Sequence, residues 1–109
     1  MVKVIMNGAN GKMGQVITRL VSDMEDVSIV AGVDINDSIV NTYPVYGDIF
    51  EVREQADVII DFSHPSCLET LLKYACEKKL PIVVATTGLS ENQKGMIQAA
   101  ARQTAVFFS

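Results

Sequence analysis

Three glycines at a spacing of three residues, Gly8, Gly11 and Gly14, are the positions most suited to binding a ligand. They follow the apolar run over residues 2–6 and directly precede a segment with helical periodicity. Glycine lets the backbone turn sharply and approach a ligand closely. A helix N-terminus presents unpaired N–H groups and the positive end of the helix dipole. This arrangement binds phosphate, and in a strand–turn–helix unit it favours the pyrophosphate of a dinucleotide.

An aspartate, Asp34, closes the second predicted strand about 20 residues after Gly14, where an acidic side chain accepts hydrogen bonds from an adenosine ribose. An aspartate that only caps a loop is the alternative. The glycine spacing departs from the common G-x-G-x-x-G pattern, because Asn10 stands where the second glycine would be. Asparagine tolerates left-handed backbone angles, so we expect the turn to persist.

The residues around Asp34 and Lys12 bear on the choice of cofactor. A carboxylate repels an adenosine 2′-phosphate, and Ile35, Asn36 and Asp37 supply no basic partner for one. The sequence therefore favours NADH, with NADPH possible through Lys12. Lys12 lies on the first helical turn, where a cation opposes the dipole, which suggests a phosphate partner or else a solvated surface lysine.

Two other predicted strand ends carry small and hydroxyl residues. They are Asp61-Phe62-Ser63-His64-Pro65 and Ala85-Thr86-Thr87-Gly88. Such residues let backbone groups approach a flat ring, although ordinary turn chemistry explains them as well. His64, the only histidine, is predicted to be a surface loop residue and not a catalytic base. No metal-ligand spacing occurs among Cys, His, Asp and Glu, so we expect no metal site.

Strands and helices alternate along the chain, which predicts a single α/β domain with a Rossmann-type doubly wound parallel sheet. We expect the strand order 3-2-1-4-5-6 and a ligand crevice between the first and fourth strands. Serine capping boxes are predicted at Ser66–Glu69 and Ser90–Gln93. The predicted strands cover residues 2–6, 27–33, 44–46, 58–60, 81–85 and 105–108, and the helices about 12–23, 48–55, 65–79 and 90–103. One buried helical stripe is predicted from Met13, Val16, Ile17, Leu20, Val21 and Met24.

Composition limits the possible functions. The chain has 109 residues, 49% of them apolar, and a net charge of −4. An acidic chain with no basic run is a poor binder of nucleic acid or anionic membranes. No apolar stretch reaches the about 18 residues of a membrane span. Cys67 and Cys76 would lie about 13 Å apart along one predicted helix, too far for a disulfide. Unpaired thiols suggest the cytoplasm.

Taken together, the motifs resemble the amino-terminal part of dihydrodipicolinate reductase (4-hydroxy-tetrahydrodipicolinate reductase), over the whole chain. The resemblance rests on Gly8-Ala9-Asn10-Gly11-Lys12-Met13-Gly14, on the two strand-end strings above, and on Val106-Phe107-Phe108-Ser109. It implies that residues 8–13 surround the pyrophosphate and that Asp34 holds the ribose. Ala85, which stands where the family typically has glycine, would line the nicotinamide with Thr86 and Thr87. Phe108 and Ser109 would begin the segment that completes this site.

The resemblance also implies an activity, the NAD(P)H-dependent reduction of a C=N bond in a cyclic dicarboxylate on the diaminopimelate route to lysine. The family continues into a second domain, whose E-x-H-H-x-x-K motif carries a catalytic histidine and lysine. The family forms homotetramers through this second domain. Nothing in this sequence matches that motif. We therefore expect residues 1–109 to be a dinucleotide-binding domain that lacks the carboxy-terminal substrate domain, contains no catalytic residue and is inactive alone.

Three other interpretations remain open at this point. The chain could be the first half of another two-domain nicotinamide dehydrogenase, acting on aspartate, homoserine or a sugar. It could be a non-catalytic module that senses NAD(H), or it could bind S-adenosylmethionine. Phe107 and Phe108 on a predicted edge strand also suggest self-association.

Overall fold

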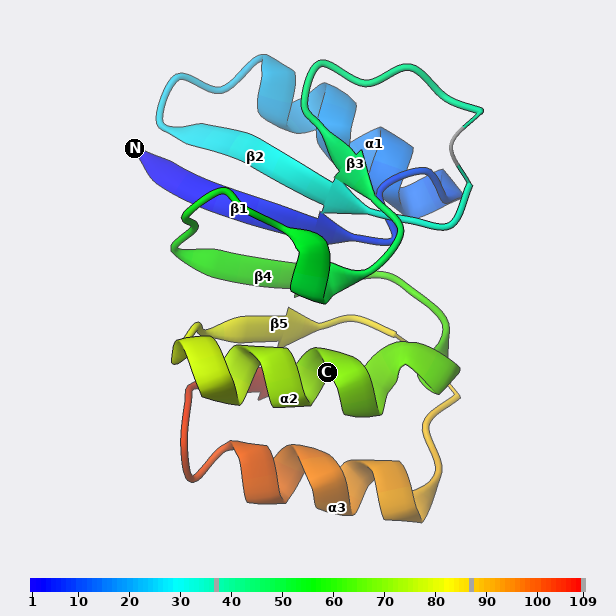
Figure 1. The fold of residues 1–109 in the computed structure, drawn as a ribbon, viewed down its shortest axis with the longest axis vertical. Helices are drawn as coiled ribbons and strands as arrows, with labels where there is room; N and C mark the ends of the chain where they lie inside the picture. The colour runs from blue at the N-terminus through cyan, green and yellow to red at the C-terminus, as the bar shows by residue number, and fades with distance from the viewer. Residues whose placement is uncertain (37, 87, 109) are drawn as a thin grey trace.

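Six parallel strands form one sheet with the order β3-β2-β1-β4-β5-β6, which confirms the predicted order and fold class. The computed structural model describes residues 1–36, 38–86 and 88–108. The order reverses between β1 and β4, because the chain crosses from the β3 edge back to the centre of the sheet (Figure 1). The strands are β1 (Val2–Asn7), β2 (Val27–Val33), β3 (Val45–Tyr46), β4 (Val58–Asp61), β5 (Ile82–Val84) and β6 (Val106–Phe108).

Helices cover both faces of the sheet. In Figure 1, α1 lies behind the sheet and α2 lies in front of it, with α3 beside α2. The three helices are α1 (Lys12–Ser22), α2 (Leu68–Lys78) and α3 (Glu91–Ala100), and two short 3-10 turns are η1 (Ile49–Glu51) and η2 (Pro65–Cys67). None of the described helices is long and apolar enough to cross a membrane.

One of the two predicted serine capping boxes is present. The Gln93 N–H donates to Ser90 Oγ at 3.1 Å, and the Ser90 N–H donates to Gln93 Oε1 at 2.9 Å. The box predicted at Ser66–Glu69 is wrong, because Pro65 opens a 3-10 turn and α2 begins only at Leu68. His64 caps that turn instead.

Two other local predictions are corrected. Asp48 does cap a helical turn, as its side chain accepts from the Phe50 N–H at 2.9 Å, but the turn ends at Glu51 and not near residue 55. Cys67 lies in η2 and Cys76 in α2, so they do not share one α-helix. Both cysteines are free.

The two faces of the sheet are buried to different extents. Side chains alternate between faces along a strand, so Ile59 and Ile82, which are register partners, point the same way. Both are fully buried and pack with Leu71 of α2 and Ile97 of α3 in the main core. On the opposite face, exposure reaches 36% at Val83 and 61% at its register partner Phe107. The face that α1 covers is therefore bare near β5 and β6.

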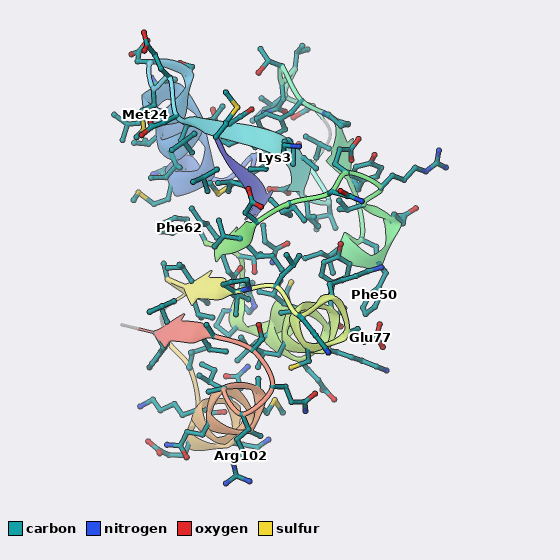
Figure 2. All side chains as sticks on the ribbon, turned by 90° about the vertical axis from the view of Figure 1, so that its left-hand side faces the viewer. Lys3, Met24, Phe50, Phe62, Glu77 and Arg102 are labelled. Carbon is teal, nitrogen blue, oxygen red and sulfur yellow. The ribbon has the colours of Figure 1, made fainter. Side chains whose placement is uncertain are left out.

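The predicted apolar stripe of α1 is largely exposed, which corrects the sequence interpretation. Met13, Val16, Leu20 and Met24 are all exposed, Leu20 to 59%, and the one fully buried residue of α1 is Gly14. Ile17 is partly buried against the small cluster around Met6, Ala9 and Tyr43. Helical periodicity shows which side of a helix is apolar. It does not show whether a neighbouring element covers that side, and α1 is the single described helix on this face (Figures 1 and 2).

Candidate functional site: a cleft at the glycine turn

Two adjoining cavities lie at the carboxyl ends of the strands, and they meet at the glycine turn. Their volumes are about 880 Å³ and 470 Å³. The residues that line both are Gly11, Phe62, Ser63 and His64. The larger cavity continues to Lys12, Ala85 and Thr86, and the smaller one continues to Gly8 and Asp34. The result is a two-lobed cleft at the switch in strand order, where doubly wound sheets bind ligands.

Two of the three glycines are required by the fold itself. Gly8 has a φ of 86°, in the left-handed region that favours glycine. At Gly14, an added Cβ would lie 2.2 Å from the Gly8 carbonyl oxygen and 2.5 Å from that of Ala9. These two positions let the chain turn after β1 and let α1 pack closely under the turn, so they need no ligand to explain them.

Gly11 is different, because nothing in the described part of the chain requires a glycine there. It is the N-cap of α1 with an extended backbone, φ −75° and ψ 174°, which any residue adopts. An added Cβ would meet only the Gly8 carbonyl oxygen, at an ordinary 3.5 Å. The position is exposed and borders both cavities. The missing side chain keeps the cleft open in front of the helix.

The first turn of α1 offers free donors to that open space. Within the described residues, the first hydrogen bond that an α1 N–H makes is from Gln15 to the Gly11 carbonyl, at 3.0 Å. The N–H groups of Lys12, Met13 and Gly14 have no acceptor in the described part of the chain. Lys12 is exposed and lines the larger cavity, and the first turn carries no acidic residue. These features suit an anion such as a pyrophosphate.

Ala9 and Asn10 shape the turn and line neither cavity. Ala9 is fully buried, and its N–H donates to the Val33 carbonyl at 3.3 Å. The Asn10 side chain donates to the Asn36 carbonyl. The turn persists with asparagine at position 10, but not through left-handed angles there, because Lys79 is the one described non-glycine residue with positive φ. The left-handed step of the turn falls at Gly8 instead.

Asp34 caps the loop after β2 and also lines the smaller cavity. Its Oδ1 accepts from the Asn36 N–H and its Oδ2 from the Asn10 N–H, each at 2.9 Å. The side chain is partly buried. A carboxylate has about four acceptor sites, so these bonds leave capacity for ribose hydroxyls.

The residues predicted for the far end of the cleft divide into three groups. Ala85 and Thr86 line the larger cavity. Phe108 lies exposed on β6, the edge strand, and lines neither cavity. Thr87 and Ser109 lie outside the described residues.

Sequence reasoning missed Asn7 as a lining residue, and it singled out the strand end that contains Phe62, Ser63 and His64 without assigning these residues to the cofactor. Their signal was their position directly at the ends of strands that a parallel sheet brings together. Figure 2 shows Phe62 beyond the end of β4, between α1 and β5 in that view. His64 is exposed as predicted, and its Nδ1 accepts from the Ser66 N–H at 3.1 Å. Among the described residues, no three His, Cys, Asp or Glu side chains are grouped to hold a metal ion.

Comparison with known proteins identifies relatives over the whole chain. A family model described as "Dihydrodipicolinate reductase, N-terminus" matches residues 2–109. A 4-hydroxy-tetrahydrodipicolinate reductase from Caldanaerobacter subterraneus subsp. tengcongensis is 42% identical over 109 residues, and one from Clostridium tetani is 40% identical over 109 residues. Each alignment covers 100% of this chain and 43% of the relative. The chain therefore spans less than half the length of these relatives.

Solved structures share the fold. Dipicolinate-bound dihydrodipicolinate reductase from Paenisporosarcina sp. TG-14 has a TM-score of 0.78 at 24% identity, covering 93% of this chain and 43% of that one. Myo-inositol 2-dehydrogenase from Lactobacillus plantarum has a TM-score of 0.80 at 16% identity, covering 99% of this chain and 36% of that one. At these identities the likeness concerns the Rossmann-type fold alone.

Proposed function

Because the chain belongs to the dihydrodipicolinate reductase N-terminal family, we propose that it is the NAD(P)H-binding domain of a 4-hydroxy-tetrahydrodipicolinate reductase. The observation that carries the proposal is the two-lobed cleft with Gly11 at its centre. A dinucleotide has two halves joined by a pyrophosphate, so a cleft with a ligand-accepting glycine and free helix N–H groups between its lobes matches that shape.

In this proposal each part of the cofactor has its own residues. The N–H groups of the first α1 turn and Lys12 hold the pyrophosphate beside Gly11. Asp34 holds the adenosine ribose in the smaller lobe. Ala85 and Thr86 receive the nicotinamide in the larger lobe. When bound, the cofactor supplies a hydride to the C=N system of a cyclic dicarboxylate, and the protein contributes orientation, which is worth several kcal/mol when the geometry is good.

We further propose that NADH is preferred over NADPH. Asp34 already accepts two N–H bonds, so its carboxylate stays at the ribose end of the smaller cavity, where it repels a 2′-phosphate. No described residue that lines this cavity is a lysine or arginine. Lys12 lines the other lobe and keeps NADPH binding possible.

The relatives' remaining length gives the proposal its second part. We propose that the substrate-binding domain, the catalytic residues and the contacts of a cytoplasmic homotetramer belong to a part of the enzyme outside residues 1–109. The names of the 42% and 40% identical relatives favour this reductase over an aspartate, homoserine or sugar dehydrogenase. The fold alone makes no such choice, since a myo-inositol dehydrogenase is equally similar in structure. No observation favours a sensing module or an S-adenosylmethionine site.

The test is a titration of NADH and NADPH into the wild type, Gly11→Val and Gly95→Val. Gly95 of α3 is a matched control, because an added Cβ there meets nothing within 4 Å. We expect NADH to bind the wild type and the control alike, and Gly11→Val to lose about tenfold or more in affinity, or about 1.4 kcal/mol. Equal NADH affinity for wild type and Gly11→Val would contradict the proposal.

A further inference from the structure

We propose that Asp61 is a positioning residue that builds the nicotinamide lobe of the cleft, an inference that rests on the proposed cofactor-binding function. Asp61 is the last residue of β4, in the centre of the sheet between β1 and β5. Its side chain is 1% exposed, so it does not touch a bound ligand directly. Its influence on the cleft passes through the residues that it holds.

The Asp61 carboxylate joins the ends of three strands. Its Oδ1 accepts from the Ser63 N–H at 2.9 Å, from the Asn7 side-chain amide at 3.0 Å and from the Ser63 hydroxyl. Its Oδ2 accepts from the Thr86 hydroxyl at 2.8 Å. Asn7 ends β1, Ser63 follows β4 and Thr86 follows β5. One buried group therefore connects the three loops that begin at these strand ends.

Sheet stability alone does not explain this carboxylate. A buried charge is costly unless it is paired or well hydrogen-bonded. In the described part of the chain, no lysine, arginine or histidine forms an ion pair with Asp61. The ion pair that occurs among the described residues joins Lys94 and Glu91, which are exposed. The other fully buried residue of β4 is Ile59, an ordinary apolar core residue. Asp61 is thus a buried carboxylate whose donors are neutral groups at the ends of β1, β4 and β5, beside the cleft.

The loops after β4 and β5, both held by Asp61, line the larger cavity. Ser63 and Thr86 both line it, as do their neighbours Phe62 and Ala85. Ser63 also lines the smaller cavity, as does Asn7. The two loops are also joined directly, since the Thr86 hydroxyl lies 2.9 Å from the Ser63 carbonyl oxygen, and the Ala85 N–H donates to the Asp61 carbonyl at 2.9 Å. Without the Asp61 side chain, Ser63 and Thr86 lose their common anchor, and the two walls of this lobe lose their fixed separation.

The adenosine lobe has a separate anchor. Asp34 ties the glycine turn to the loop after β2 through Asn10 and Asn36, and none of these residues bonds to Asp61. Of Asp61's partners, Thr86 lines the larger cavity alone, whereas the smaller lobe keeps Asp34 and the glycine turn as its own anchor. Removal of the Asp61 carboxylate should therefore weaken the nicotinamide contacts more than the adenosine and pyrophosphate contacts. This selectivity separates a positioning role from general destabilisation.

The experiment compares NADH with ADP-ribose, which has the same adenosine and pyrophosphate but no nicotinamide. Both are titrated into the wild type, Asp61→Ala and Asp61→Asn. For Asp61→Ala we expect NADH affinity to fall about tenfold, with ADP-ribose affinity within about twofold of wild type and with a reduced fluorescence enhancement of NADH at saturation. Asp61→Asn should keep most of the wild-type NADH affinity and NADH fluorescence enhancement. Its side-chain oxygen can accept from Ser63, and its amide can donate to Thr86 Oγ1.

Thr86→Val provides a second route if Asp61→Ala fails to fold. It keeps the side-chain shape and removes the hydroxyl that contacts Asp61 and the Ser63 carbonyl, so we expect the same selective loss for NADH. Equal weakening of both ligands, no weakening of either, or wild-type binding of ADP-ribose as tight as that of NADH would overturn the inference. If the wild type binds neither NADH nor ADP-ribose, the proposed function itself is overturned, and this inference with it.

Discussion

Asp34 and Asn10, 24 residues apart in the sequence, are joined by a 2.9 Å hydrogen bond from the Asn10 backbone N–H to the Asp34 Oδ2. Through this bond the end of β2 holds the glycine turn that follows β1. The other Asp34 oxygen accepts from the Asn36 N–H. In the proposed function, the ribose-binding carboxylate and the pyrophosphate-binding turn therefore form one rigid unit.

The first prediction concerns Asp34→Asn. This change removes the charge and leaves one oxygen for two backbone donors, so an N–H loses its acceptor. Because a hydrogen bond to a charged group contributes about 1.5–3 kcal/mol, we expect NADH affinity to fall about tenfold or more. NADPH affinity should fall less, because repulsion of the 2′-phosphate is also removed. Parallel calorimetric titrations measure both, and an unchanged NADH-to-NADPH affinity ratio would contradict the assignment of Asp34 to the ribose.

The second prediction separates two glycines that look equivalent in the sequence. Gly14→Ala should lower the free energy of unfolding by about 1–3 kcal/mol, because its Cβ would lie 2.2 Å from a backbone carbonyl. Gly11→Ala should change stability by less than about 1 kcal/mol, because the gain from a stiffer unfolded chain offsets the loss of a favourable N-cap residue. Denaturant unfolding of both variants provides the measurement. Equal destabilisation by the two changes would show that Gly11 also serves packing.

The third prediction concerns catalysis. Residues 1–109 with NADH and the cyclic dicarboxylate substrate should give no steady oxidation of NADH, because the proposal places the catalytic residues elsewhere in the enzyme. NADH absorbance followed over time is the assay, and a full-length relative serves as the positive control. Sustained turnover by this chain alone would disprove the division of labour between the two parts.

The fourth prediction is that the chain self-associates at high concentration through the bare side of the sheet. Val83 and Phe107 are exposed register partners there, and β6 is an edge strand. Phe107→Glu should shift sedimentation toward the monomer. Val40→Glu is the matched control, because it adds the same charge at an exposed residue that lies in neither helix nor strand. A wild type that stays monomeric up to about millimolar concentration would argue against this surface.

The fifth prediction concerns alkaline stability and Tyr74 of α2. Burial raises the pKa of the Tyr74 phenol above its usual 10.0. The folded state therefore favours the neutral phenol, so this contribution to stability is fully present below pH 10.0 and is lost as pH rises through the higher folded pKa. Tyr74→Phe should lose less stability than the wild type over that alkaline interval. Unfolding free energies measured at neutral and alkaline pH test this, and parallel declines for the two proteins would contradict it.

The sequence by itself determined the features that depend on local chain properties. Alternating strand and helix patterns were sufficient for the parallel sheet, its order and the Rossmann-type fold, because periodicity and connection handedness leave few arrangements. The Ser90–Gln93 capping box was predictable for the same reason, since its partners lie within one helical turn. The glycine turn was found from its spacing and its place between a strand and a helix.

Only the tertiary structure decided features that depend on what lies across the sheet. It showed that Leu20 on α1 is exposed, since no other described helix covers that flank, and that Gly11, unlike Gly14, faces open space. It also brought Asn7, Asp61 and Thr86 to one buried point at the strand ends. A residue's own pattern determines its backbone and its polar or apolar side. Its partners and its exposure depend on chain segments that are distant in sequence and meet only when the sheet forms.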